Sequence, residues 1–214
     1  MGSYYPAFLD LEGRRCVVIG GGEVAERKVG ALLSAGARVT VVSPEATAEI
    51  ARLAQTNEVV WHRRGYEAGD LTDAWLAIAA TDDGSVNRAI GRDAEERRVL
   101  LNVVDQPALC NFIAPSVVQR GDLTIAVSTA GKSPAMARKV RHEIERAFPP
   151  EYGVLLEVAA EARRELMREG HQAEPELWQT ALSDEVLSLA RPGDTGAARV
   201  QLLKTLRQRT PVAG

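Results

Sequence analysis

Hydrophobic residues in the first half of the chain come in short unbroken runs, and three of the five runs are followed by a stretch with helical spacing. The first run, residues 15–19, ends in three consecutive glycines, after which hydrophobic residues recur at helical spacing until Gly36. Further runs at 38–42, 59–61, 75–80 and 99–104 alternate with helical stretches at 46–54 and 85–97. Runs without polar alternation between amphipathic helices are typical of a parallel sheet covered on both faces. The pattern therefore predicts an α/β fold with a Rossmann-like, doubly wound parallel sheet.

The pattern changes after Asp105. Short strands are expected at 112–113, 117–118 and 123–128. A helix to about Phe148 is expected to begin at Ser133-Pro134, because serine suits the N-cap and proline the first helical position. Three helices are expected after it, at 154–169, 174–189 and 195–208. We therefore expect a sheet domain at 1–113, a mixed α/β connector at 114–148 and a C-terminal helical domain at 149–214.

Composition and charge narrow the possible partners. The chain has 214 residues, of which 45% are hydrophobic and 26% charged, so it has enough apolar side chains for a sizeable core. A net charge of −3 argues against a general nucleic-acid binder or a binder of anionic membranes. The sequence has no run of about 18 apolar residues, so we expect a cytoplasmic protein without a membrane anchor. The two cysteines and three histidines have no metal-ligand spacing, and no metal site is predicted.

The glycine-rich segment after the first strand is the main candidate for a binding site. Gly20-Gly21-Gly22-Glu23-Val24-Ala25 fits the pattern G-x-G-x-x-G/A. In this pattern Gly20 makes the turn, Gly22 lets the backbone approach a pyrophosphate, and Ala25 allows close packing of the helix. The helix N-terminus offers free N–H groups to the phosphates. Dinucleotide binding is predicted, with a purely structural turn as the alternative.

The end of the second strand bears on the choice of dinucleotide. In NAD-binding sheets of this type, an acidic residue at the end of the second strand usually accepts hydrogen bonds from the ribose of NAD. In this sequence Ser43 stands at that position. Glu45 could serve from the next turn, after Pro44. Because neither Arg nor Lys stands there to favour a 2′-phosphate, NAD is preferred over NADP.

Polar residues also follow the fourth and fifth strands, at the edge where open α/β sheets bind ligands. Thr81 and Asp82 could contact the cofactor, but Asp82 or Asp83 could instead cap the following helix. Asn87, one turn into that helix, could face either the core or a ligand. Asp105 could act as an acid or base beside a nicotinamide, or it could be an ordinary turn aspartate before Gln-Pro.

The segment at 128–134 combines hydroxyl groups, a glycine and a lysine at a helix N-terminus, which suits an anion. Thr129, Lys132 and Ser133 are its candidate ligand contacts. Arg138 and Arg141 on the following helix could complete a local basic patch for an acidic substrate. The alternatives are an ordinary capped loop and a solvated charged helix face.

Taken in order, these motifs resemble the precorrin-2 dehydrogenase and sirohydrochlorin ferrochelatase family, which completes siroheme synthesis. The matching blocks lie within about the first 150 residues. They are Tyr5-Pro6, Gly20 to Lys28, Ala80 to Asp83, Asn102 to Asp105, Phe112 to Pro115 and Ser128 to Pro134. The helical tail is similar to the family only in general character.

The resemblance implies an NAD-dependent oxidation of precorrin-2 to sirohydrochlorin, with iron insertion as an open second activity. It also implies a homodimer in which 114–148 is the dimerisation segment and the clefts hold the tetrapyrrole. Asp105 falls on the catalytic aspartate of the family, Glu23 and Val24 on a cofactor-contacting pair, and Pro44-Glu45 on another cofactor contact. Lys132, Arg138 and Arg141 could then hold the acetate and propionate groups of the substrate. A non-catalytic dinucleotide sensor is the competing hypothesis, which leaves Asp105 without a role.

Overall fold

The structure is a computed structural model that describes residues 4–208. The chain divides into two compact units, Met1–Ala114 and Pro115–Gly214. Each unit has its own hydrophobic core. Within the described residues, no helix has the length and hydropathy that a membrane-spanning segment needs. The further division of the second unit into a dimerisation segment and a helical domain stays a prediction.

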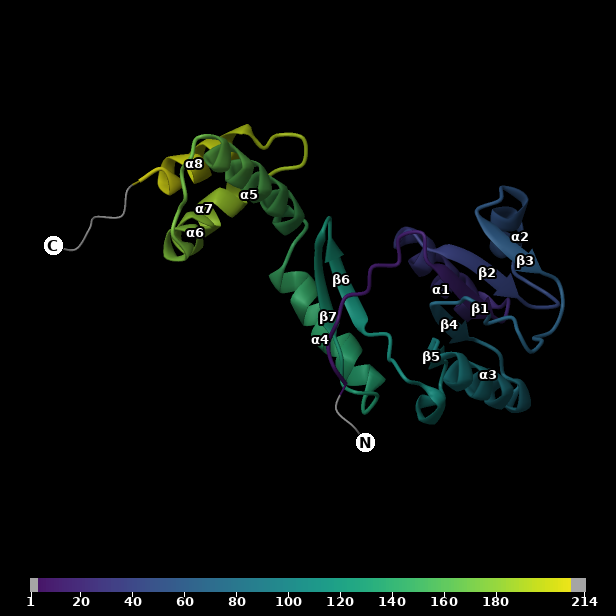
Figure 1. Cartoon of the computed structure of the whole chain (residues 1–214). Coiled ribbons are helices and arrows are strands. Elements are labelled where there is room, and N and C mark those ends of the chain that lie inside the picture. Colours follow the sequence, from purple (N-terminus) through teal and green to yellow (C-terminus); the bar gives the residue numbers. More distant parts are fainter. Residues whose placement is uncertain (1–3, 209–214) are drawn as a thin grey trace. The chain divides into compact units, whose positions relative to one another are not determined.

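The first unit is built on a five-stranded parallel sheet (Figure 1). Its strands have the spatial order β3-β2-β1-β4-β5, so the order reverses at β1. The strands are β1 (Arg15–Ile19), β2 (Arg38–Val42), β3 (Val59–His62), β4 (Leu76–Ala79) and β5 (Leu100–Val103). All four neighbouring pairs are parallel, with Arg15 opposite Arg38 and Cys16 opposite Leu76. The predicted Rossmann-like parallel sheet is confirmed.

Helices cover both faces of this sheet. α1 (Glu23–Ser34) and α2 (Ala48–Gln55) share one core with the strands, and α3 (Gly84–Arg97) packs in the other. Successive residues of a strand point to opposite faces, so Val18 joins the α1 core and Val17 the α3 core. Because both faces of the central strands are buried, these strands need apolar residues at nearly every position, which explains their unbroken runs.

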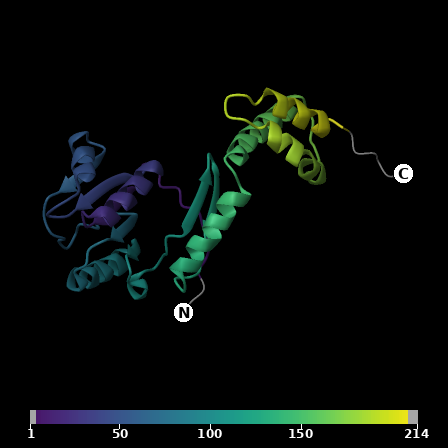
Figure 2. The same ribbon diagram turned by 180° about the vertical axis from the view of Figure 1, so that it is seen from behind.

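The second unit begins with an antiparallel hairpin, β6 (Ser116–Arg120) and β7 (Leu123–Val127), followed by α4 (Pro134–Ala147). Ser133 is the N-cap of α4, as predicted, and its Oγ accepts a hydrogen bond from the Met136 N–H at 3.1 Å. The remaining helices are α5 (Glu151–Arg168), α6 (Pro175–Ala181), α7 (Asp184–Leu189) and α8 (Gly196–Leu206). They form one core, which includes Val158 and Leu202, and are visible together in the green-to-yellow part of Figure 2.

Two expectations about secondary structure are wrong. The single helix expected at 174–189 is two helices, because Ser183 caps α7 and its Oγ accepts from the Val186 N–H at 3.4 Å. Residues 112–113 are not a strand. A short 3₁₀ helix, η1 (Pro107–Leu109), and the residues after it lie along the free edge of β5 and bond to it mainly through side chains.

Candidate functional site

The turn after β1 is packed so tightly that two of its glycines have no room for a side chain. Gly20 has a φ of +118°, and a Cβ there would lie 2.3 Å from the Ala80 carbonyl oxygen. A Cβ at Gly21 would lie 2.0 Å from the Glu45 carbonyl oxygen. At Gly22, by contrast, a Cβ would meet nothing within 4 Å. The backbone at Gly22 is therefore open to a ligand, while Gly20 and Gly21 hold the loops after β4 and β2 against the turn.

The first turn of α1 has free hydrogen-bond donors. Gly22 is the N-cap and no side chain caps the helix, so its first N–H groups lack a side-chain partner. Ala25 is buried at 1% exposure, which brings the helix close to the sheet. An uncapped helix N-terminus beside an open glycine is the donor arrangement that a pyrophosphate needs. These residues therefore fit the phosphates of a dinucleotide.

The loop after β2 is tied to the glycine turn. The Thr47 N–H donates to the Gly21 carbonyl at 2.9 Å. Ser43 is buried, and its carbonyl accepts a hydrogen bond from Trp61 Nε1 at 2.9 Å. Pro44 and Glu45 are exposed. Of the candidates at this strand end, Glu45 therefore has the accessible carboxylate for a ribose hydroxyl, while Ser43 is packed beneath the loop.

The turn between β4 and α3 carries Thr81 and Asp82. Thr81 is half-buried and Asp82 is exposed. Asp83 is the N-cap of α3, as the capping alternative proposed: its Oδ1 accepts from the Ser85 and Val86 N–H groups at 2.7 and 3.2 Å. Hydrogen bonds from the Ser85 side chain and from these N–H groups lower the pKa of Asp83. Asp83 is thus a capping residue, and Thr81 and Asp82 stay candidates for cofactor contact.

Asp105 lies just after β5, next to the end of β4, where the Val104 N–H donates to the Ala79 carbonyl at 2.9 Å. Its backbone has a φ of +57°, which is uncommon for a residue other than glycine. The side chain is exposed, and within residues 4–208 no hydrogen-bond partner of its carboxylate is found. The structure thus places Asp105 at the same edge of the sheet as the glycine turn, with a carboxylate that is free to act.

The basic segment belongs to the second unit. Thr129 Oγ1 accepts from the Ser133 N–H at 3.3 Å and donates to the Ser133 carbonyl at 3.1 Å, which closes the loop before α4. Lys132 and Arg138 are exposed. Arg141 pairs with Glu145 one turn along the helix, so its charge is already partly balanced. Lys132 and Arg138 are therefore the more available cations of the predicted patch.

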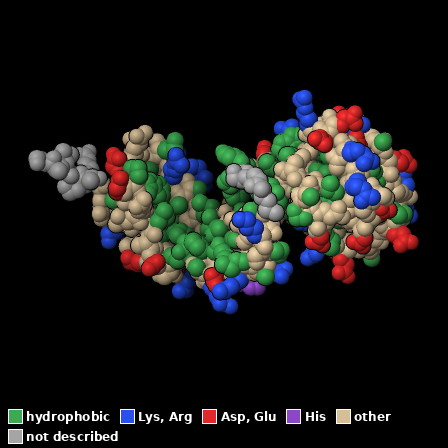
Figure 3. Space-filling model, turned by 90° about the horizontal axis from the view of Figure 1, so that it is seen from below, with side chains coloured by type: hydrophobic (Ala, Val, Ile, Leu, Met, Phe, Trp, Pro, Cys, Tyr) green, Lys and Arg blue, Asp and Glu red, His purple; other side chains and the backbone are tan. Residues whose placement is uncertain are grey.

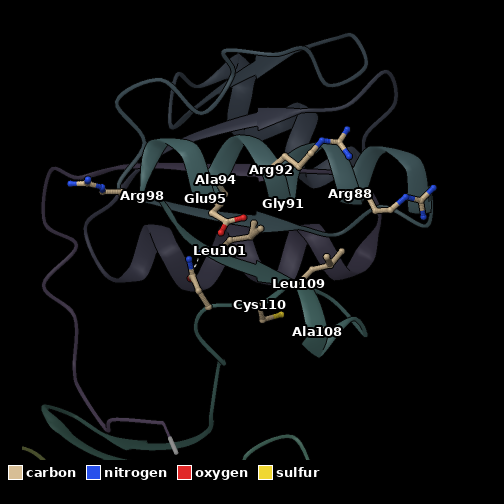
Figure 4. Close-up of a pocket in the computed structure, with 11 residues that line it drawn as sticks. Arg88, Gly91, Arg92, Ala94, Glu95, Arg98, Leu101, Ala108, Leu109 and Cys110 are labelled. Carbon is tan, nitrogen blue, oxygen red and sulfur yellow. Dashed lines mark hydrogen bonds between the residues drawn. The ribbon is translucent and has the colours of Figure 1, made fainter. Parts of the chain in front are cut away.

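A separate hollow of about 640 Å³ lies beside α3. Figure 4 shows Leu101 and Leu109 in the space between this helix and the η1 segment, while Arg88, Arg92 and Arg98 point outward. None of the predicted site residues lines it. It therefore lies apart from the glycine turn and contributes nothing to the candidate site.

Sequence reasoning missed two contributors at this edge and left a third undecided. It treated Gly21 as the variable position of the motif, although Glu45 leaves no room for a side chain there. It gave no role to Thr47, which bonds to the glycine turn and also caps α2, as its Oγ1 accepts from the Ile50 N–H at 3.3 Å. It left open which way Asn87 faces, and the residue is fully buried. Only the cap at Thr47 has a local sequence signal, a threonine before a helical pattern.

Comparison with known proteins places this geometry in a family. A family model described as putative NAD(P)-binding matches residues 7–116, and one described as sirohaem biosynthesis protein central matches residues 120–147. Siroheme synthases from Methylobacillus flagellatus and Thioalkalivibrio sulfidiphilus are both 41% identical to the chain over 95% of its length. The chain spans only 44% and 42% of those relatives, which is less than half of their length.

A solved structure extends the likeness across both units. The structure of SirC, a precorrin-2 dehydrogenase, has a TM-score of 0.73 to the chain at 25% sequence identity. The match covers 95% of this chain and 97% of that one. The resemblance seen in the motifs is thereby confirmed. The chain belongs to the siroheme-biosynthesis family of precorrin-2 dehydrogenases and siroheme synthases, with a putative NAD(P)-binding domain at residues 7–116.

Proposed function

We propose that this chain is an NAD-dependent dehydrogenase that converts precorrin-2 to sirohydrochlorin in siroheme biosynthesis. The observation that carries the proposal is the match to a precorrin-2 dehydrogenase over nearly the whole of both chains. The open glycine turn, the uncapped α1 and the free carboxylate of Asp105 at one sheet edge support it. When bound, the oxidised dinucleotide supplies a hydride acceptor.

The chain's own residues bind and orient the cofactor. The N–H groups of Gly22, the N-cap of α1, and of Glu23 and Val24 in its first turn donate to the phosphates, and the α1 dipole favours their negative charge. Glu45 accepts from the adenosine ribose and disfavours a 2′-phosphate, which selects NAD over NADP. Thr81 and Asp82 line the other side of the turn, beyond Gly20.

Asp105 is the proposed catalytic base. Oxidation of precorrin-2 removes a hydride from a ring carbon and a proton from the macrocycle, and an exposed carboxylate can accept that proton. A positioned base of this kind contributes about 10²–10⁴-fold to a rate. Lys132 and Arg138 supply positive charge for the acetate and propionate groups of the substrate, with Thr129, Ser133 and Arg141 beside them.

We further propose that the chain acts as a homodimer through its hairpin and α4. A two-stranded hairpin is marginally stable alone and needs further packing. None of the 14 residues of α4, all of them described, is buried, and Val117 of β6 and Met136 of α4 are 43% and 52% exposed. Figure 3 shows hydrophobic side chains gathered on the surface of this unit. A second copy would cover them, and light scattering should give about twice the 23.1 kDa chain mass.

The thiols support a reducing compartment, which we take to be the cytoplasm. Cys16 and Cys110 are both free. Burial raises the pKa of Cys16 to about 11, so this thiol is unreactive at neutral pH. Cys110 is half-buried and bonds to the β5 backbone, with its Sγ 3.1 Å from the Val103 nitrogen. Neither cysteine contributes to the proposed reaction.

The test of the proposed function compares two matched aspartates. Asp105 and Asp73 are both exposed and both have a φ of +57°, and asparagine tolerates that conformation. With precorrin-2 and NAD⁺ under anaerobic conditions, we expect Asp105→Asn to lose NADH production by at least 100-fold while keeping NADH binding. Asp73→Asn should keep both. If wild-type protein forms neither NADH nor sirohydrochlorin, the enzyme proposal fails and a dinucleotide sensor is favoured.

A further inference from the structure

One buried polar atom near the glycine turn has no partner. Asn87, in the first turns of α3, is 0% exposed. Within residues 4–208, two buried side-chain atoms lack a hydrogen bond, Asn87 Oδ1 and Arg199 Nε, and the second belongs to the other unit. A buried carbonyl oxygen without a donor is destabilising, so proteins rarely keep one unless it has a use.

The orientation of the Asn87 amide follows from its neighbour. The amide Nδ2 donates to the Thr81 carbonyl at 3.0 Å. The reverse orientation would set two carbonyl oxygens against each other, so only the NH₂ group can face Thr81. Oδ1 is therefore an acceptor that is held in place and left without a donor.

The position of Asn87 links it to the candidate site. Its partner Thr81 follows Ala80, whose carbonyl oxygen is the atom that leaves no room for a side chain at Gly20. Asn87 thus supports the loop that presses on the glycine turn. The acidic residue that binds the adenosine ribose lies after β2 in this fold, so the β4 side of the turn serves the nicotinamide half of the dinucleotide.

We propose that Asn87 is a positioning residue for the nicotinamide half of the cofactor. Its NH₂ group fixes the Thr81 carbonyl, and its buried Oδ1 accepts a hydrogen bond from a donor of the protein or a water molecule that the bound nicotinamide half brings into place. The inference rests on the proposed NAD binding. It adds a specific role for a buried residue that does not itself take part in the reaction.

Replacement by leucine, which is similar in size, separates this role from a purely structural one. Asn87→Leu removes the unpaired acceptor but also the hydrogen bond to the Thr81 carbonyl. Because these two effects oppose each other, its unfolding midpoint without ligand should fall by less than that of a variant that loses a fully paired amide. Its NADH affinity should fall about three- to tenfold, since one neutral hydrogen bond is lost. Its affinity for AMP, which has only the adenosine half, should change less than twofold. Both affinities are measured by calorimetry.

Asn111→Leu is the control for the loss of a paired amide, at an asparagine that is exposed. Both amide groups of Asn111 are satisfied, by the Leu101 N–H at 2.7 Å and the Val99 carbonyl at 2.9 Å, at the other end of β5. This variant should lose stability and keep its NADH affinity. If Asn87→Leu does not fold, Asn87→Ala is measured in the same way, and the ratio of NADH to AMP affinity remains the readout.

Two results would overturn the inference. A parallel loss of NADH and AMP affinity would mean that Asn87 only maintains the fold, and an unchanged NADH affinity would mean that Oδ1 has no role in binding. Failure of the proposed function looks different, because wild-type protein would then bind neither NADH nor AMP.

Discussion

Two adjacent glycines in the turn after β1 differ in the space around them, and this difference can be tested directly. A Cβ at Gly21 would lie 2.0 Å from the Glu45 carbonyl oxygen and 2.8 Å from Ala46 Cα, whereas one at Gly22 would meet nothing within 4 Å. Neither glycine has a left-handed φ, so strain of that kind does not separate them. We expect Gly21→Ala to destabilise the first unit far more than Gly22→Ala.

The size of the effect follows from the contact. Ordinary van der Waals contact begins near 3.4 Å, so the backbone at Glu45 must move by more than an ångström. Overpacking of this kind costs about 1–3 kcal/mol. The same loop holds the Thr47 N–H bond to Gly21, and its loss adds about 0.5–1.5 kcal/mol. We expect a total of about 2–4 kcal/mol for Gly21→Ala. For Gly22→Ala we expect at most about 1 kcal/mol, because alanine is a poorer N-cap than glycine.

Urea unfolding followed by tryptophan fluorescence measures this difference. A Trp178→Phe background leaves Trp61 and Trp75, which both belong to the first unit. Trp61 is a sensitive reporter because its Nε1 donates to the Ser43 carbonyl in the loop that must move. With a urea dependence of about 1–3 kcal/mol per molar, Gly21→Ala should lower the midpoint by about 1–2 M. Equal midpoints for the two variants would refute the packing argument.

Three further predictions test other parts of the chain. Burial alone would raise the pKa of Asp93, but hydrogen bonds from Tyr66 and Arg97 outweigh it and hold the pKa below 3.8. The ionised Asp93 therefore stabilises the fold above that pH, and this stabilisation is lost as the pH falls through the lowered pKa. Between pH 7 and pH 3, the free energy of unfolding should fall less steeply for Asp93→Asn than for the wild type. Ser133→Ala removes the cap of α4 and should cost about 1 kcal/mol in thermal unfolding; no change would mean that the cap is unimportant. Arg138→Gln should raise the KM for precorrin-2 several-fold. Lys139→Gln, which removes a cation that pairs with Glu143, should leave the KM unchanged. Equal effects of the two substitutions would count against a specific role for Arg138.

The sheet was predictable from the sequence because each of its central strands is a run of mainly apolar residues. Both faces of β1 after Arg15 and of β4 are buried, so these strand positions are apolar and the runs stand out. The cap at Ser133 was equally readable, since serine followed by proline in front of a helical pattern is typical of a helix start. The break in 174–189 was missed because Ser183 caps α7 in the middle of a stretch whose hydrophobic spacing continues across it.

The details of the site depend on residues that are distant in sequence. The carbonyl oxygen of Glu45, 24 positions later in the sequence, leaves no room for a side chain at Gly21. The spacing of residues in the glycine motif cannot predict this contact. The free edge of β5 is closed by the side chains of Cys110 and Asn111, where the hydrophobic pattern suggested a strand at 112–113. The pairing of Arg141 with Glu145 is a different case, because its i, i+4 spacing is a local signal that the sequence contains, and this pairing makes Arg141 less available to the basic patch.

Unsatisfied polar groups in the first unit gather at one edge of the sheet. The first turn of α1 has N–H groups without a side-chain cap, and Asn87 Oδ1 has no donor. Elsewhere in this unit comparable groups are paired: Thr47 caps α2, Asp83 caps α3, and Asn111 completes the edge of β5. A bound ligand that supplies partners to these groups forms hydrogen bonds that the chain alone does not make. Dinucleotide binding should therefore stabilise the first unit, by about 2.7 kcal/mol at 100 times the Kd. The stabilisation should be seen in the fluorescence of Trp61 and Trp75.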